Sequence, residues 1–308
     1  MTSQTRPADR RAVPAFLPSP AEPLPHQIVA ALAQHRMATT QQLQDMLRPQ
    51  ATRQTITKPL NRLHREGLAA FTVLPQSNRR RAWFLTPEGA RIARDWPQLR
   101  GRPPYPITSA SAASMKTPHV LTVVRAHLTF LQDARRRGDE HGHLDWTPEV
   151  AHSLGDSERV IADALLHYVL HASDGSRTKL RALVEVDRAT TSSERLATKL
   201  IEYARLHTYT PTPPGRRAIQ ANTPPAWQRW YPVFPRLLFI LTGASPTTLA
   251  HRIEDLQAMT AEHPAVAQLA RTVPLGAALL DDLEQQGPTE HVWTPLNGRG
   301  QRRPWTQL

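Results

Sequence analysis

Two apolar segments of the chain carry acidic residues at positions where a strand would be buried. Asp163 lies inside the apolar run 160–166, and Glu185 and Asp187 lie at the end of a second such run, 180–187. A carboxylate that is desolvated without a partner is costly, so acids in strand interiors need a compensating group. The two runs therefore predict neighbouring strands of a buried sheet whose three acids share a cation.

A lysine twelve residues beyond Asp187 extends this pattern. Lys199 lies on a predicted helix, 192–207, with Tyr203 one turn further along. A divalent metal held by carboxylates polarises a phosphate and activates a water, and a nearby ammonium neutralises the charge that develops. We therefore predict a phosphodiester-cleaving site in which Asp163, Glu185 and Asp187 bind Mg²⁺, Lys199 stabilises the phosphate and Tyr203 orients it.

Two alternatives to this site remain open. Tyr203 would be a covalent nucleophile if the protein worked as relaxases do, although relaxases gather histidines around their metal and none is expected near this motif. His119 and His127 share a helix and are expected in capping or core roles. In the other alternative, Lys199 pairs with Asp187 or Glu185 and no reaction occurs. The catalytic hypothesis requires the carboxylates of Asp163 and Glu185 to converge on one ion.

Length and composition limit the class of protein. A chain of 308 residues with 40% hydrophobic residues can form two domains with cores, and the absence of cysteine excludes disulfides and thiolate zinc sites. Its apolar stretches are far shorter than the roughly 20 residues of a membrane span. We therefore expect a cytoplasmic protein without membrane contact, beginning with a disordered, proline-rich arm over residues 1–24.

The positive charge is concentrated at one end of the chain. Of the net charge of +12, residues 1–110 hold 16 Lys and Arg against 6 Asp and Glu, whereas residues 111–308 hold 22 against 20. A basic module beside a nearly neutral one is typical of a protein that grips a polyanion with one part only. Double-stranded DNA is therefore the expected partner of the N-terminal module.

Residues 25–96 have the pattern of a winged helix-turn-helix. Apolar spacing predicts helices over 25–36, 40–47 and 52–66, with Thr39 or Thr40 as the cap of the second helix and Gly67 ending the third. Two strands, 69–74 and 82–85, form a hairpin with arginines at its tip, and Thr86-Pro87 begins a further helix. The outer face of the third helix and the wing predict the following DNA-contacting residues: Arg53, Gln54, Thr57, Lys58, Asn61, Arg62, Arg65, Arg79, Arg80 and Arg81.

A predicted linker, 97–117, separates this module from an α/β domain, 118–296, and a tail, 297–308. The expected order of the α/β domain is helix 119–137, three strands, helix 192–207, strand 236–242 and helix 246–259, which is the order of a restriction-endonuclease-like core. That fold carries an acid on one strand and acid-x-Lys on the next. Here Asp187 stands where the lysine is expected, and Lys199 would supply the ammonium from the following helix.

Several short motifs, in this order, resemble the replication-relaxation family of plasmid and integrative-element proteins. They are His119-Val120-Leu121-Thr122-Val123, Ala162-Asp163-Ala164, Val184-Glu185-Val186-Asp187-Arg188 with Thr190, Lys199-Leu200 with Tyr203, and residues 237–242. The family usually has Pro-Asp where this chain has Ala162-Asp163. The resemblance extends over roughly residues 25–295. It implies a winged helix joined to a nuclease-like domain and a role in replication, mobilisation or relaxation of plasmid DNA.

The sequence thus predicts an α+β protein of plasmid replication or mobilisation that binds double-stranded DNA and nicks or cleaves it with Mg²⁺. One alternative is a non-catalytic replication or transcription regulator with a degenerate nuclease fold. Another is a protein-interaction partner of a relaxase, with weak and salt-insensitive DNA binding. Winged helices commonly recognise two-fold operators, so a homodimer is a further expectation, as is contact with other plasmid replication or transfer proteins.

Overall fold

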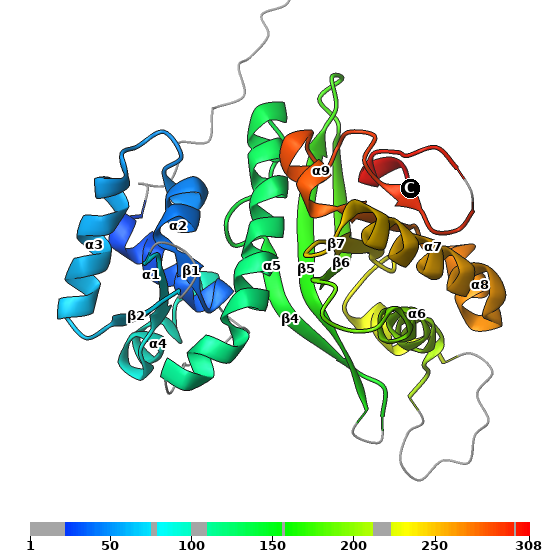
Figure 1. The fold of residues 1–308 in the computed structure, drawn as a ribbon, viewed down its shortest axis with the longest axis horizontal. Helices are drawn as coiled ribbons and strands as arrows, with labels where there is room; N and C mark the ends of the chain where they lie inside the picture. The colour runs from blue at the N-terminus through cyan, green and yellow to red at the C-terminus, as the bar shows by residue number, and fades with distance from the viewer. Residues whose placement is uncertain (1–21, 75–78, 100–109, 156–157, 212–222, 299) are drawn as a thin grey trace, which may run out of the picture.

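The computed structural model describes residues 22–74, 79–99, 110–155, 158–211, 223–298 and 300–308. It is a mixed α/β protein with two sheets, one of three strands and one of six. A small helical unit lies on one side of the long helix α5, and the six-stranded sheet lies on the other (Figure 1). The predicted disordered arm, residues 1–24, falls almost wholly outside the described residues.

The N-terminal unit has the predicted helices and hairpin in the predicted order, with a short strand added between the first two helices. Its elements are α1 (Leu24–His35), β1 (Ala38–Thr39), α2 (Thr40–Leu47), α3 (Arg53–Arg65), β2 (Ala69–Val73), β3 (Arg81–Leu85), α4 (Pro87–Ala93) and the 3₁₀ turn η1 (Pro97–Leu99). Local chemistry sets the helix starts. The Thr39 side chain accepts from the backbone N–H of Gln42, whose side chain accepts from that of Thr39, while Thr86 caps α4 ahead of Pro87.

The larger unit is built on the six-stranded sheet, in the order β4-β5-β6-β7-β8-β9. The β6–β7 and β7–β8 pairs are parallel and the other pairs are antiparallel. Its strands are β4 (Trp146–Ser153), β5 (Arg159–His171), β6 (Arg177–Asp187), β7 (Arg236–Leu241), β8 (Leu275–Leu279) and β9 (Thr294–Pro295). Its helices are α5 (Ala110–Arg137), α6 (Ser193–Thr208), α7 (Pro246–Glu262), α8 (Pro264–Ala270) and α9 (Leu280–Gln285), with the 3₁₀ turns η2 (Ala226–Arg229) and η3 (Trp305–Gln307).

Helices cover both faces of the six-stranded sheet. Helices α6, α7 and α8 share one apolar cluster with one face, while α5, α9 and the C-terminal tryptophans share another cluster with the opposite face. The outer side of α5, through Val124, Leu128 and Leu131, completes the core of the N-terminal unit. One helix therefore contributes to the cores of both units.

Helix α5 begins nearer the N-terminus than the sequence predicts. Its first residue is Ala110, inside the predicted linker 97–117, and residues 97–99 form η1; the intervening stretch 100–109 lies outside the described residues. The segment from Ala110 to Ser114 contains three alanines, the strongest helix former, so it extends the helix that follows. The predicted linker, 97–117, thus includes the first residues of α5 and the turn η1.

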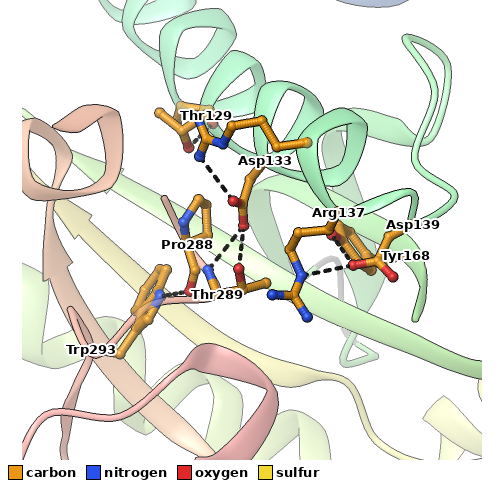
Figure 2. Close-up of polar contacts among 10 residues, drawn as sticks. Thr129, Asp133, Arg137, Asp139, Tyr168, Pro288, Thr289 and Trp293 are labelled. Carbon is orange, nitrogen blue, oxygen red and sulfur yellow. Dashed lines mark hydrogen bonds and ion pairs between the residues drawn. The ribbon is translucent and has the colours of Figure 1, made fainter. Parts of the chain in front are cut away.

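Polar contacts fix the C-terminal end of α5 to the sheet unit. Figure 2 shows the buried Asp133 accepting from both the backbone N–H and the hydroxyl of Thr289, while Tyr168 of β5 donates to Asp139 just beyond the helix, at 2.9 Å. Trp305, in the predicted tail 297–308, is fully buried and packs edge-on against Phe130 of α5. The last residues of the chain thus belong to the core, which their position at the end of the sequence did not indicate.

Three buried histidines form a cluster between the two units, called here the seam histidines: His35 of α1, His127 of α5 and His141. The His127 ring lies 4.8 Å from that of His35 and 5.1 Å from that of His141, centroid to centroid. Burial is the main cause that lowers their pKa values, to about 4 for His35 and His141 and well below the usual value for His127. The two units therefore meet across neutral imidazoles.

None of the helices in the described part of the chain combines the length and the apolarity that a membrane span requires.

Candidate functional site

Strands β5 and β6 separate near the middle of the sheet, and the predicted catalytic residues lie around this point. The β5–β6 pairing runs from His171–Arg177 to Ala164–Val184 and stops there. Beyond it, residues 159–162 pair with β4, while 185–187 pair with β7. We call this opening the fork. It leaves polar backbone atoms of both strands without their usual cross-strand partners, and side chains replace them.

Asp163 fills the β6 side of the fork. Its Oδ2 accepts from the backbone N–H of Val186 at 2.7 Å, where an unbroken ladder would place a carbonyl. Its Oδ1 accepts from Nε2 of His119, on α5, at 3.0 Å. This hydrogen bond is the main cause that raises the pKa of His119. A histidine does therefore lie beside the motif, contrary to the capping or core role expected for His119 from the sequence.

Glu185, Tyr203 and Lys199 meet on the β5 side of the fork. The Tyr203 hydroxyl donates to Glu185 Oε1 at 2.5 Å, and Lys199 Nζ lies 3.6 Å from the same oxygen. Lys199 also donates to the Ile161 carbonyl at 2.9 Å. Its ammonium thus replaces a cross-strand partner of β5 where β6 has separated from that strand. Burial, and next the charge of Asp163, raise the pKa of Glu185 to about 8. The fork thus holds one carboxyl that resists ionisation unless positive charge is added.

The structure gathers four of the five predicted catalytic residues, but from both sides of the sheet. Asp163 is held by α5, which covers one face, and Glu185 by α6, which covers the other. Tyr203 is fully buried, so its hydroxyl orients Glu185 and is not exposed to a phosphate. The predicted roles of Tyr203 as an orienting group for the phosphate or as a covalent nucleophile therefore find no support in this geometry.

The fork has donors that suit Mg²⁺, though fewer than predicted. Mg²⁺ usually keeps several waters and takes one or two carboxylates, and the pKa of Glu185 is raised first by burial and next by the charge of Asp163, so added positive charge would favour its ionised form. Two carboxylates thus suit a hydrated ion in their chemistry, but Asp163 is held from the α5 face of the sheet and Glu185 from the α6 face. The predicted site of three carboxylates does not form: within the described ranges no cluster of three or more His, Asp or Glu side chains is arranged to hold a metal.

Asp187, the third predicted ligand, is engaged elsewhere. Its Oδ2 accepts from Nε of Arg252, on α7, at 2.6 Å, and its Oδ1 accepts from the backbone N–H of Ala189 at 3.1 Å. Both members of this ion pair are less than one tenth exposed. The side chain at position 187 thus joins α7 to the end of β6 and is not assembled with the fork residues.

Removing the partner of Asp187 should be strongly destabilising. Arg252→Met would leave a buried carboxylate without compensation, and we expect a loss of about 3–5 kcal/mol in the free energy of unfolding, measured in urea. The double variant Arg252→Met/Asp187→Leu removes both charges and should recover most of the loss. A loss below about 1 kcal/mol in the single variant would show that solvent or another group already compensates Asp187.

The predicted DNA-contacting residues lie on α3 and on the β2–β3 hairpin. Arg53, Gln54, Lys58 and Arg65 are exposed on α3, and Thr57 is half-buried with its hydroxyl bonded to the Arg53 carbonyl. Two further exposed residues of α3, Asn61 and Arg62, interact with Arg81 and Glu66 respectively.

The hairpin arginines differ in their surroundings. All three, Arg79, Arg80 and Arg81, are exposed. The Arg81 guanidinium lies 4.1 Å from the Phe71 ring centroid, and Arg80 lines a groove of about 470 Å³ that α2 and α5 also line. The hairpin tip, residues 75–78, lies outside the described residues. The structure thus presents α3 and the base of the hairpin as basic, exposed elements of the N-terminal unit.

The comparisons with known proteins gave one match. The family model described as replication-relaxation matches residues 29–218, which include most of the N-terminal unit and the whole fork. No curated protein and no solved structure matches the chain.

Proposed function

Because the chain belongs to the replication-relaxation family, which suggests a role in replication or mobilisation of a plasmid or related element, we propose that it works there by binding double-stranded DNA. The N-terminal unit would act as a winged helix, with α3 in the major groove and the β2–β3 hairpin on the backbone. The observation that carries this proposal is the exposed basic face of α3, from Arg53 to Arg65, next to a hairpin that also exposes arginines.

Salt dependence tests the DNA-binding proposal. Each lost phosphate contact reduces the slope of log K against log salt by about 0.9, so Arg53→Ala/Lys58→Ala should bind a DNA duplex more weakly, with a slope lower by about 2. Fluorescence anisotropy over a range of salt concentrations measures both quantities. Arg177→Ala/Arg205→Ala, which removes the same charge from exposed positions of the sheet unit, is the control and should keep the parental slope. Weak binding with a flat slope in the parent would favour the protein-interaction alternative.

A second function, metal-dependent cleavage of DNA, is supported by the gathering of Asp163, Glu185 and Lys199 where the sheet opens. Asp163 and Glu185 would hold Mg²⁺, which when bound would polarise a phosphate and lower the pKa of a water. Tyr203 keeps Glu185 in place from the buried side. Lys199, about three-tenths exposed, can offer its ammonium to a phosphate only by leaving the Ile161 carbonyl.

The alternative to cleavage is a regulator in which the fork residues only hold the sheet together. The hydrogen bonds of Asp163 to Val186 and of Lys199 to Ile161 are contacts that such a structural role would use. Nicking of supercoiled plasmid by the parent protein with Mg²⁺, and its loss in fork variants, separates the two functions. DNA binding without nicking would leave the regulator as the function of the chain.

A further inference from the structure

A series of polar side chains leads from the N-terminal unit to Asp163. Arg36, just beyond α1, pairs with Glu149 of β4 through Nη2 and Oε2 at 2.5 Å. Glu149 and His119 line the same small cavity, and the charge of Glu149 adds, after the hydrogen bond to Asp163, to the raised pKa of His119. His119 in turn donates to Asp163. The four residues Arg36, Glu149, His119 and Asp163 line a single cavity of about 20 Å³, large enough for about one water molecule.

The backbone at both ends of the Arg36–Glu149 pair is held in an unfavourable conformation. Arg36 has φ of 65° and Glu149 has φ of 49°, the left-handed region that non-glycine residues rarely occupy. Glu149 is also the residue that the β4–β5 register omits: Pro148 pairs with Ala164 and Val150 with Ala162, so Glu149 and Asp163 face each other unpaired within the ladder. Strain of this kind persists where surrounding contacts hold it, often at functional sites.

We propose that the N-terminal unit completes the fork: Arg36 holds Glu149, and through it His119, so that the Asp163 carboxylate is correctly placed only when the two units are docked. Arg36, Glu149 and His119 are positioning residues in this proposal. The proposal rests on the proposed cleavage function only for the catalytic role of Asp163, and not for the position of its carboxylate. The placement itself has its own signature, because Asp163 accepts the Val186 amide proton and thereby protects it from exchange with solvent.

Amide hydrogen exchange at Val186, followed by NMR in the full chain, tests the placement without any metal or DNA. Arg36→Ala and Glu149→Gln should accelerate Val186 exchange about five- to tenfold, as expected when one hydrogen bond is weakened. The amides of Leu238 and Ile240, in the core strand β7, should keep their rates. Arg36→Lys keeps the charge and should restore most of the protection.

The matched control removes a contact between the units that is remote from the fork. Arg135 of α5 donates to the Asp45 and Met46 carbonyls of α2, and Arg135→Gln should leave Val186 exchange unchanged. Equal acceleration at Leu238 in Arg36→Ala, or an effect of Arg135→Gln as large as that of Arg36→Ala, would mean general destabilisation and would overturn the proposal. Unchanged Val186 exchange in Arg36→Ala would overturn it as well.

A second measurement connects the placement to function. If the parent protein nicks DNA, Arg36→Ala should lower the nicking kcat about tenfold, the usual effect of losing a residue that orients a metal-binding group, with little change in DNA affinity. A fall in affinity with unchanged kcat would show that Arg36 serves DNA binding and would contradict its positioning role. If the parent does not nick, the cleavage proposal fails, while the exchange experiment still decides whether Arg36 positions Asp163.

Discussion

Glu185→Gln should abolish Mg²⁺-dependent DNA nicking while leaving DNA affinity intact. The amide keeps the size of the side chain and can still accept from Tyr203, but it cannot supply the negative charge that a metal ion needs. Removal of one group that stabilises charge in a transition state typically costs about 10²- to 10³-fold in rate, so nicking of supercoiled plasmid should fall to the background level. Asp163→Asn and Lys199→Ala should behave in the same way.

The chain offers a matched control for this experiment in Glu202. Its Oε2 lies 3.5 Å from Lys199 Nζ, as near as Glu185 Oε1 at 3.6 Å, but its side chain is more exposed than that of Glu185. Glu202→Gln makes the same chemical change at the same lysine and should nick DNA at the parental rate. If Glu185→Gln and Asp163→Asn also nicked at that rate, the cleavage site would have to lie elsewhere in the protein.

The second large effect is expected from acid. The pKa values of His35 and His141 are about 4 in the folded state, against about 6.5 in the unfolded chain, so the unfolded state binds more protons between these values. The stability that the neutral seam histidines provide is therefore present above pH 6.5 and is lost as pH falls towards 4. A pKa that differs by one between the folded and unfolded states changes the free energy of unfolding by about 1.4 kcal/mol, so we expect a loss of several kcal/mol over this range.

Urea unfolding at a series of pH values measures this loss. His127→Phe retains a flat ring between His35 and Trp146 but cannot be protonated, so its unfolding free energy should depend less on pH than that of the parent. His251→Gln, at an exposed position of α7, is the control and should reproduce the parental profile. A parental stability that stays constant from pH 7 to pH 4.5 would contradict the burial of neutral imidazoles between the units.

Local signals in the sequence predicted much of the fold. The Thr39 capping box, the Thr86-Pro87 helix start and the apolar stripe of α3 each act within a few residues, and the corresponding elements are present as expected. The two apolar runs with acids are indeed neighbouring strands. These features could be predicted because the physical cause of each lies within one turn of helix or one strand.

The partners of the acids could not be predicted in this way. His119 meets Asp163 across 44 positions of sequence and Arg252 meets Asp187 across 65, and neither spacing carries a periodic signal. The separation of β5 from β6 was equally hidden, because the apolar residues of both strands continue past the last pair. The positions of the acids in apolar runs thus indicated that each carboxylate needs a positively charged or hydrogen-bonding partner. Which group serves as the partner depends on the tertiary structure, which brings His119 to Asp163 and Arg252 to Asp187.

Because α5 belongs to the cores of both units, neither unit can be exchanged alone in evolution without a loss of packing. Val124, Leu128 and Leu131 on one side of the helix complete the N-terminal unit, while Val123, Ala126 and Phe130 complete the sheet unit. A recombination event at residues 97–117 would transfer the N-terminal unit without the α5 residues that complete its core. The surface of the N-terminal unit should therefore diversify in this family by substitution at exposed positions such as those of α3 more readily than by exchange of the whole unit.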